Sequence, residues 1–589
     1  MTLAANHLYS NGPEIQGAFG VDALPLTTVA HIISFLDDDV GSLARLCRTS
    51  KVLYYMTLPH LWKRVALKSH STVHYRNNMP EGLGSASPFS MGLNALVTRH
   101  VSSLVRSLVL EGDFKVADLE EYARASRISE STMILNIALR AAVDQCLHLE
   151  NFKWDLNVRI QPNMYAGLAK LSRLESLWLR CPERRSPQPS SEIPPFPRLK
   201  SFTMTHYDPM CYPDDVSTFF LHADSLETLN MHFSPRMRDE CEPSVDLTRM
   251  LRKNIAAKKQ LHLKSIGLYN LFADAASAEC EEAMDVSSSH TITALNSFGL
   301  DEDDAAAHRS STHFIDRTWV VASAKEKHPP KSMRVDHVSK SHAWHLSHAV
   351  GMERLYLINA RHKPEGTTNG TSPSSTEPSP STSNGSTPTP TTILRDLYLD
   401  GICGVVGPTL KHLILPARWC LPAPLTAKLV RSCPNLTQLS ASIECDDMGV
   451  LRLIFPFLSK LWAIRVLQPK LEGEDGERRV AAFNSFISRP DCMLESKLED
   501  ALSQRGPAGG VPDFPALKYI GLGHKIWEVG GVFEEIVQSP VSQDGANGSL
   551  TPVPGISREE IVYKRRLRRI DEKDVAHVEI WLMDSMDII

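Results

Sequence analysis

The sequence predicts an α/β protein: a short all-α module at the N-terminus, followed by an irregular β/α solenoid with disordered insertions. The stretch 21–67 carries short helical stripes of apolar residues that are too few to make a large core alone. From residue 100 onward a triplet recurs, in which two residues separate the first two apolar positions and one residue separates the last two. Segments with few core-forming residues interrupt this pattern and predict the insertions.

The composition limits the classes of function. A hydrophobic content of 42% over 589 residues is ordinary for a folded protein. The net charge of −5 argues against a dedicated nucleic-acid binder, which needs a basic surface. No run of eighteen apolar residues predicts a membrane span, and the first residues lack the pattern of a signal peptide. We therefore expect a cytoplasmic and/or nuclear protein that binds neither nucleic acid nor membrane.

The cysteines predict neither disulfides nor a zinc ribbon. There are 11, an odd number, and they are dispersed along the chain without a C-x-x-C pair. Reduced, buried thiols are the simpler expectation.

The N-terminal module follows a leader, 1–20, that we expect to be flexible. Thr27 or Thr28 can act as an N-cap, because a hydroxyl accepts a hydrogen bond from a free backbone N–H. The aspartates at 37–39 interrupt the helical pattern, and Pro59 is expected to break it again. The apolar positions form three stripes: Val29, Ile32, Ile33 and Leu36; Leu43, Leu46 and Cys47; Leu53 and Met56.

These residues resemble an F-box. The features that match are Leu24-Pro25, Ile32-Ile33 with Leu36, Leu43 with Leu46-Cys47-Arg48, and Leu61-Trp62. Thr27 replaces an acidic residue and Lys51 an aromatic residue that are often found at these places, so adaptor affinity is left open. The alternative is an N-terminal helical hairpin that caps a larger domain.

The resemblance implies a partner. F-boxes dock on the small Skp adaptor of an SCF (cullin–RING) ubiquitin ligase. The residues implied in adaptor binding are Leu24, Pro25, Ile32, Ile33, Leu36, Leu43, Leu46 and Cys47. Which of them face the adaptor and which face the module's own core is left open.

The triplets repeat at a period typical of one repeat class. The middle residues Leu177, Phe202 and Leu229 are 25 and 27 residues apart, and Leu413, Leu439 and Ile464 are 26 and 25 apart. That spacing lies within the roughly 20–29-residue period of leucine-rich repeats. Helical patterns fill several gaps, which predicts strands on the inner face of a solenoid. Further triplets are centred at Leu108, Phe152, Ile266, Leu355, Leu397, Ile520 and Val578.

The repeats resemble the irregular leucine-rich repeats that follow F-boxes in many fungal proteins, and this implies binding of a target protein. Residues between and just after the leucines of each strand should point away from the core, onto the concave face. Aromatic and arginine residues there are common anchors of binding surfaces, although simple solvent exposure is the alternative. The residues predicted to bind a target are Trp178, Arg180, Asn230, His232, Tyr356, Tyr398, Asp400 and Arg465.

The predicted organisation follows from these patterns. It comprises a leader (1–20), the F-box (21–67), a connector (68–99), repeats (100–272), an acidic insertion (273–312), a further repeat region (313–365), a disordered Ser/Thr/Pro insertion (366–392), repeats (393–537), a disordered loop (538–556) and a C-terminal basic helix and strand (557–589).

No pattern in the chain predicts catalysis, a cofactor or a metal. His337, His342, His345 and His348 lack cysteine or acidic partners at usable spacing, so a polar helix surface around Trp344 is expected. Gly401, Gly404 and Gly407 do not match a phosphate-binding loop and suit a turn between repeats. The basic run 564–569 suits an amphipathic helix, which is either a cationic contact face or a solvated one.

The favoured hypothesis is therefore a non-enzymatic substrate-recognition subunit of an SCF ubiquitin ligase. The alternative is a leucine-rich-repeat scaffold in a non-degradative F-box/adaptor complex. A third hypothesis places an enzyme in the irregular region 313–350, and it predicts a deep pocket with perturbed titratable groups.

Overall fold

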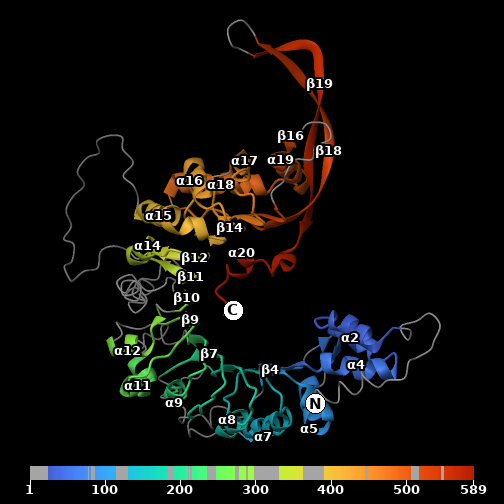
Figure 1. Cartoon of the computed structure of the whole chain (residues 1–589), viewed down its shortest axis with the longest axis vertical. Coiled ribbons are helices and arrows are strands. Elements are labelled where there is room, and N and C mark those ends of the chain that lie inside the picture. Colours follow the sequence, from blue (N-terminus) through green and yellow to red (C-terminus); the bar gives the residue numbers. More distant parts are fainter. Residues whose placement is uncertain are drawn as a thin grey trace. The chain divides into compact units, whose positions relative to one another are not determined.

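The computed structural model divides the chain into two units, which are described separately (Figure 1). The first unit is Met1–His262 with Ser277–Met284, and the second is Leu263–Ala276 with Asp285–Ile589. The structure describes residues 24–73, 75–76, 78–80, 87–114, 130–182, 191–209, 211–212, 215–234, 247–271, 278–286, 289–296, 330–362, 390–444, 449–471, 473–505, 516–544 and 550–588.

The N-terminal module consists of three short helices, α2 (Leu26–Ser34), α3 (Val40–Leu46) and α4 (Lys51–Leu61). The side chains of Asp39 and Ser50 cap α3 and α4 by accepting from backbone N–H groups. Two local predictions are wrong. Thr27 and Thr28 lie inside the first turn of α2, which begins directly after Pro25, and Pro59 lies inside α4 instead of ending it.

The sheet of the first unit is parallel. Its strands pair in the order β1 (Arg64–Ser69), β4 (Ser107–Gly112), β5 (Asn151–Leu156), β6 (Ser176–Arg180), β7 (Ser201–Tyr207) and β8 (Thr228–Phe233). A small hairpin joins β2 (Tyr75–Arg76) and β3 (Met79–Pro80). The helices are α5 (Pro88–Thr98), α7 (Glu130–Gln145), α8 (Pro162–Leu168), α9 (Ser217–Leu221), α11 (Leu247–Ala257) and α12 (Ala278–Ala283), with a 3-10 helix at His100–Leu104.

The triplet centres align across this sheet and confirm the repeat pattern there. Phe152 lies beside Leu108 on one neighbouring strand and Leu177 on the other, and Phe202 continues the row to Leu229. All five side chains are buried. Strand β1 was not predicted. It starts at Arg64, directly after the helical module, and pairs with β4 inside the segment assigned to the F-box and connector.

The second unit has a mostly parallel sheet that ends in antiparallel strands. The parallel strands pair in the order β9 (Ser265–Tyr269), β10 (Thr291–Leu295), β11 (Ser332–Val338), β12 (Arg354–His362), β13 (His412–Ile414), β14 (Gln438–Ala441), β15 (Ala463–Val466) and β17 (Tyr519–Leu522). Antiparallel strands β18 (Lys525–Asp544), β19 (Leu550–Ile570) and β16 (Gln504–Arg505) follow.

The helices of the second unit include one irregular run. They are α14 (Lys340–Leu346), α15 (Pro390–Gly401), α16 (Ala423–Ser432), α17 (Gly449–Ile454), α18 (Gly473–Ile487), α19 (Asp491–Leu502) and α20 (Glu579–Leu582), with a 3-10 helix at Glu572–Val575. A π-helix (Ile402–Val406) and a 3-10 helix (Gly407–Thr409) continue α15. The glycines Gly401, Gly404 and Gly407 therefore lie in a helical run, and the predicted turn between repeats is wrong. None of the helices in the described residues is long and apolar enough to cross a membrane.

Several element predictions in this unit are also wrong. The triplet around Leu397 lies in helix α15, because the three-residue spacing of Leu394 and Leu397 places both on one face of a helix. Strand β10 of this unit and helix α12 of the first unit both lie inside the predicted acidic insertion 273–312. The triplet at Val578 lies between a 3-10 helix and α20, not in a strand.

The long hairpin β18–β19 shows that two further predictions are wrong. Residues predicted as the loop 538–556 lie largely in these two strands, and the basic run 564–569 lies in β19 rather than a helix. The basic side chains make cross-strand ion pairs, such as Lys564–Glu535 and Arg568–Glu528. Opposite charges face each other across a β-ladder as readily as along a helix. The leader 1–20, residues 297–312 and residues 366–389 lie outside the described residues.

Candidate protein-interaction surfaces

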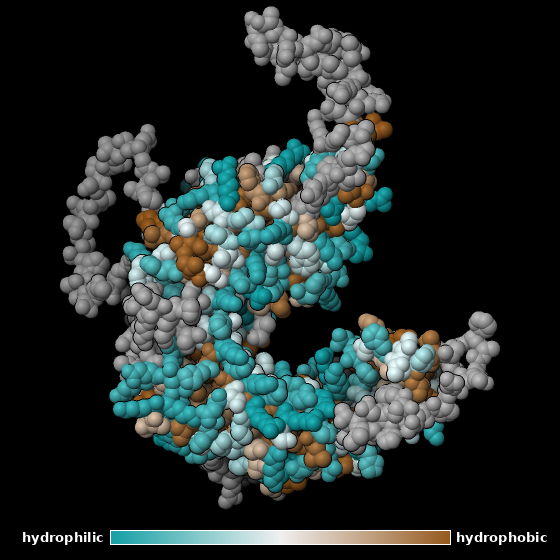
Figure 2. Space-filling view, viewed as in Figure 1, coloured by the Kyte–Doolittle hydropathy of each residue, from teal (hydrophilic) through white to brown (hydrophobic). Residues whose placement is uncertain are grey.

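The first candidate surface is the apolar exterior of the helical module. Its core contains Val29, Ile33, Leu43 and Met56, which are all buried. Large apolar side chains nevertheless remain outside, and Figure 2 shows brown residues over α2 and α4. The exposed set is Leu24, Ile32, Phe35, Val40, Val52, Tyr54 and Tyr55. A small module that leaves this many large apolar residues in water is expected to cover them with a partner.

The structure sorts the predicted adaptor-binding residues by position. Ile33 and Leu43 are buried inside the module. Leu36 and Leu46 pack against that core and are partly buried, and Cys47 is also partly buried. Leu24, Pro25 and Ile32 are exposed. Of the predicted set, only these last three are fully available to a partner.

Sequence reasoning missed the most exposed members of this surface. Phe35 is 76% exposed and directly follows α2, and Val40, Val52, Tyr54 and Tyr55 come from α3 and α4. The signal was present: Phe35 lies outside the stripe formed by Val29, Ile33 and Leu36, so a helical projection places it on the solvent side.

Ion pairs fix the aspartate turn of the module. The Asp37 carboxylate accepts from His60 Nδ1 at 2.5 Å and pairs with Lys63 Nζ at 3.1 Å. The hydrogen bond from His60 is the largest cause that lowers the pKa of Asp37, followed by the one from Lys63. These contacts join the turn between α2 and α3 to the end of α4. They hold the exposed apolar residues of the three helices in one arrangement.

The second candidate surface is the face of the first sheet opposite the buried leucines. Lys153, Trp178, Thr203 and Asn230 stand in one row across β5–β8. The Lys153 ammonium lies 4.3 Å from the centre of the Trp178 ring, an arrangement that a cation–π attraction stabilises. Trp178 is half-buried, and Trp178 Nε1 is buried without a hydrogen-bond partner in the described residues.

Charged residues continue this face. Asp155 Oδ2 lies 3.1 Å from Lys153 Nζ, and its other oxygen lies 3.7 Å from Arg180. These three side chains are 25–31% exposed, so the pairs are accessible to solvent. Pairs of this kind exchange partners at little cost, because the net stability they contribute is about 0–1 kcal/mol each.

The end of the face near β8 is less polar than the sequence suggests. Asn230 donates to Thr203 Oγ1 at 3.3 Å, and the His206 backbone N–H donates to His232 Nδ1 at 3.1 Å. Burial, with a smaller repulsion from His206, lowers the pKa of His232 to about 4. His232 is therefore neutral near pH 7 and offers no charge to a partner.

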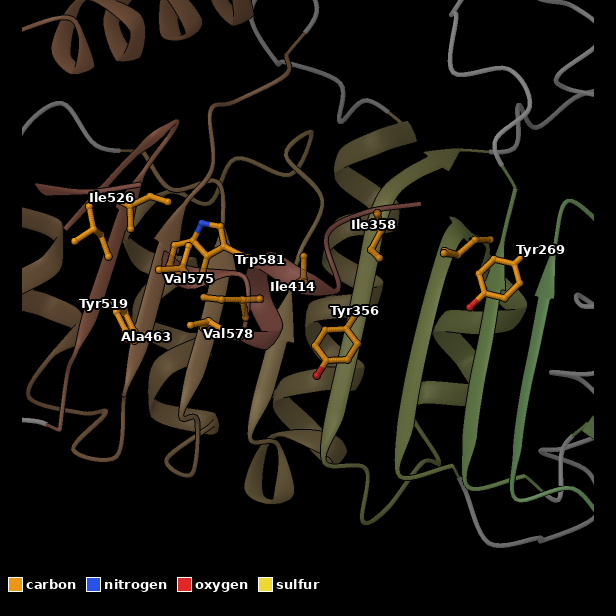
Figure 3. Packing of buried hydrophobic residues seen from close by; sticks show 13 residues of the cluster. Tyr269, Tyr356, Ile358, Ile414, Ala463, Tyr519, Ile526, Val575, Val578 and Trp581 are labelled. Carbon is orange, nitrogen blue, oxygen red and sulfur yellow. The ribbon is translucent and has the colours of Figure 1, made fainter. Parts of the chain in front are cut away.

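The corresponding face of the second sheet is covered by the chain's own C-terminal segment, residues 571–588. Figure 3 shows Val575, Val578 and Trp581 over the strands beside Ile414 and Tyr519. These side chains belong to one buried cluster. Gly521 makes room for this packing, since a Cβ there would lie 2.8 Å from Trp581 Cζ2.

Polar contacts join the segment to the sheet at four places in the described residues. The Arg334 guanidinium donates to the backbone carbonyls of Met583, Ser585 and Asp587 at 2.5–3.1 Å. Arg465 donates to the Ile580 carbonyl at 3.3 Å and pairs with Asp584 at 2.7 Å.

Glu579 occupies the third place. Its carboxylate accepts from the Tyr356 hydroxyl and lies 2.5 Å from His412 Nδ1, while Arg354 approaches to 3.7 Å. The hydrogen bond from His412 is the main cause that lowers the pKa of Glu579 to about 2. In addition, the Ile580 backbone N–H donates to Gln438 Oε1 at 3.1 Å.

Four of the predicted target-binding residues are not available on an open face of the sheet. Tyr356 and Arg465 lie on the face predicted for them, but the C-terminal segment occupies it. Tyr398 and Asp400 do not lie on a strand, so that placement was wrong. Tyr398 is buried in α15 and hydrogen-bonds to His342, and Asp400 pairs with Lys428 on the surface.

Two of the four histidines, His342 and His345, belong to the core, whereas His348 is exposed beside Trp344, which lies on the surface of the helix. His342 is fully buried, with Nδ1 2.8 Å from the Tyr398 hydroxyl. Burial lowers the pKa of His342 and brings that of His345 to about 4. Within the part of the chain that the structure describes, no three His, Cys, Asp or Glu side chains are grouped as metal ligands. Burial also raises the pKa of the Cys146 and Cys433 thiols to about 12, as expected of inert core cysteines.

Comparisons with known proteins add little. No family model matches the chain, and no curated protein matches it. Among solved structures, the yeast complex of Rad7 and Elc1 contains a chain that is 14% identical, with a TM-score of 0.32. The match covers 78% of this chain and 100% of the other. A likeness this weak supports no conclusion about function.

Proposed function

We propose that this protein is a non-enzymatic substrate-recognition subunit of an SCF (cullin–RING) ubiquitin ligase. Residues 24–62 act as an F-box that binds the Skp adaptor, and through it the cullin. The solenoid holds a target protein, and the ligase raises the effective concentration of the ubiquitin-conjugating enzyme at that target. The protein acts in the cytoplasm, the nucleus or both.

The observation that carries this proposal is the exposed apolar surface of the helical module. Ile32 and Phe35 are 48% and 76% exposed, although the three helices that carry them share a well-formed core. The features that resemble an F-box lie in these helices. Residues that stabilise the module are inside it, and a second apolar set remains outside for a partner.

For the target, we propose the open face of the first sheet. Trp178 and Arg180 are the anchors, with Asn230 and His232 at the far end of the rows. Trp178 offers a large, partly exposed ring, and the contact of Arg180 with Asp155 is accessible to solvent. Both residue types are enriched at energetically important positions of interfaces.

The test is binding of purified Skp adaptor to the intact chain and to the double variant Ile32→Glu, Phe35→Glu. We expect at least a hundredfold loss of affinity, because two apolar contacts are lost and two carboxylates are desolvated. Both side chains are exposed, so the variant should fold. Ile134→Glu is the matched control, because Ile134 is 63% exposed on α7 of the same unit. Equal adaptor binding by all three proteins, or by none, contradicts the proposal.

A non-degradative F-box scaffold is the second candidate. Both candidates bind the adaptor, so the discriminating measurement is reconstitution with adaptor, cullin and ubiquitin-conjugating enzyme. A ligase subunit recruits the cullin and supports ubiquitin transfer, whereas a scaffold binds the adaptor alone.

A further inference from the structure

The C-terminal segment 571–588 packs on a sheet that does not need it for its hydrogen bonds. In the described residues, strands β11–β15 pair with one another in parallel, and no backbone pairing includes residues 571–588. The other face of these strands is already buried, as Leu355, Leu413 and Leu439 show. The segment is therefore attached in the way a bound peptide is. Its apolar side chains pack on the face of the sheet, and arginines of the sheet donate to its backbone carbonyls. Its carboxylates pair with cationic side chains of the sheet.

Charge is complementary across this contact. The segment 571–588 contains six acidic residues and one lysine. The sheet beneath presents Arg334, Arg354 and Arg465, together with His412. Arg334 is 3% exposed, and it donates to three backbone carbonyls and to the Ser585 hydroxyl of the segment. A guanidinium with five donors that is satisfied in this way is suited to holding polypeptide carbonyls.

The contacts also indicate which features of a peptide this face of the second sheet can bind. Tyr356 and His412 receive the Glu579 carboxylate, and Arg465 receives the Asp584 carboxylate five residues later. Between them, Trp581 fills the space above Gly521. Beyond the end of α20, Arg334 donates mainly to backbone carbonyls, which any side chain can follow, and also to the Ser585 hydroxyl. These requirements describe an acidic, amphipathic peptide with one helical turn.

We propose that this face of the second unit is a binding site for acidic amphipathic peptide segments, and that residues 571–588 are its built-in ligand. A partner that carries a similar segment competes with the C-terminal segment for the site. The identity of that partner as a ligase target rests on the proposed function. The existence of the site does not.

The experiment converts the built-in ligand into a separable one. A protease site is inserted in the full chain after Ile570, where Asp571, Glu572, Lys573 and Asp574 are exposed. After cleavage, a fluorescent peptide of residues 571–589 is added, and exchange is followed by anisotropy. We expect saturable exchange into cleaved protein and none into uncleaved protein, because an intramolecular ligand is present at a high effective concentration.

Peptide variants test the chemistry without disturbing the fold of the protein. Glu579→Ala and Asp584→Ala should each weaken competition about tenfold or more, since each removes a charge-assisted hydrogen bond. Glu572→Ala is the matched control: it removes one acid that lies exposed outside the contacts, and it should compete as the parent peptide does. Equal competition by all the peptides overturns the proposed selectivity.

Two further outcomes overturn the proposal itself. If cleaved protein retains the segment and never exchanges it, or unfolds when the segment leaves, then residues 571–588 are ordinary core. The exchange is measured on the chain alone, without adaptor. Peptide exchange together with failed adaptor binding would therefore contradict the ligase function and support the peptide site. Adaptor binding without peptide exchange would support the ligase function and contradict the peptide site.

Discussion

The two sheets of this protein are built from the same triplet, yet their opposite faces differ. In the first unit, Lys153, Trp178 and Arg180 remain partly exposed, Lys153 contacts Trp178 and Asp155, and Arg180 approaches Asp155. In the second unit, Tyr356 and Arg465 hold the chain's own C-terminal segment. The triplet specifies which side chains pack beneath the helices. It does not specify what lies on the other side of the strands.

The difference follows from the residue types on the two faces. The first face carries charges of both signs, which pair locally and remain soluble in water. The second face carries Ile414, Ala463 and Tyr519, apolar surface that is stabilised when it is covered. Arginines at its edges then contact the covering segment. The apolar centre of the second face is covered by the C-terminal segment, whereas the charged residues of the first face remain partly exposed.

The largest effect should come from a charge placed in the covered face. Val578→Asp puts a carboxylate where Val578 is fully buried. We expect a loss of about 4 kcal/mol or more in the stability of the second unit, from lost burial and from desolvation of the charge. Denaturant unfolding, with hydrogen exchange of β13–β15 to locate the loss, measures it. The control Val532→Asp lies at a site that is 40% exposed, and it should cost far less.

Acid should weaken the covered face through Glu579. Its pKa is about 2, below the usual 4.5, so its contribution to stability is complete above pH 4.5 and is lost as the pH falls towards 2. The shift corresponds to roughly 3 kcal/mol at most. The stability difference between the parent protein and Glu579→Gln should shrink over this range. A difference that stays constant from pH 6 to pH 2.5 would count against the ion pair. Comparing the two proteins cancels the contribution of other acids such as Asp584.

A smaller effect should come from filling the space above Gly521. Gly521→Ala forces Trp581 to move, and we expect a cost of about 1–3 kcal/mol. In a Trp581→Ala background the same change should cost much less, and a double-mutant cycle measures the coupling. Gly531→Ala is the matched control, because a Cβ there meets no atom within 4 Å. Additive costs at Gly521 and Trp581 would show that the two residues do not contact each other.

The smallest effect should come from the open face. Trp178→Ala removes a half-buried ring and its contact with Lys153, and we expect a loss of about 1 kcal/mol in the first unit. Thermal unfolding of this variant, beside Trp581→Ala from the covered face, compares the two faces directly. A loss as large as that of Trp581→Ala would mean that Trp178 is a core residue rather than an accessible one.

The sequence determined much of the repeat array. Residues such as Phe152, Leu177 and Phe202 alternate with polar neighbours at a regular period, and burial of one side of a strand requires that alternation. Prediction from the sequence failed where the spacing of apolar residues fitted more than one kind of element. In the triplet around Leu397, the first spacing of three residues fits a helix and the second spacing of two fits a strand, and the segment forms a helix. Strand β10 was hidden by its acidic and serine-rich surroundings.

Only the tertiary structure decided which surfaces are open. The sequence could not show that Ile33 lies inside the helical module and Ile32 outside it, because both fit one helical stripe. Nor could it show that residues 571–588 return to cover Tyr356 and Arg465. Local patterns fix local structure through the periods of the helix and the strand. Contacts between residues more than 100 positions apart depend on the three-dimensional path of the chain, which no local period encodes.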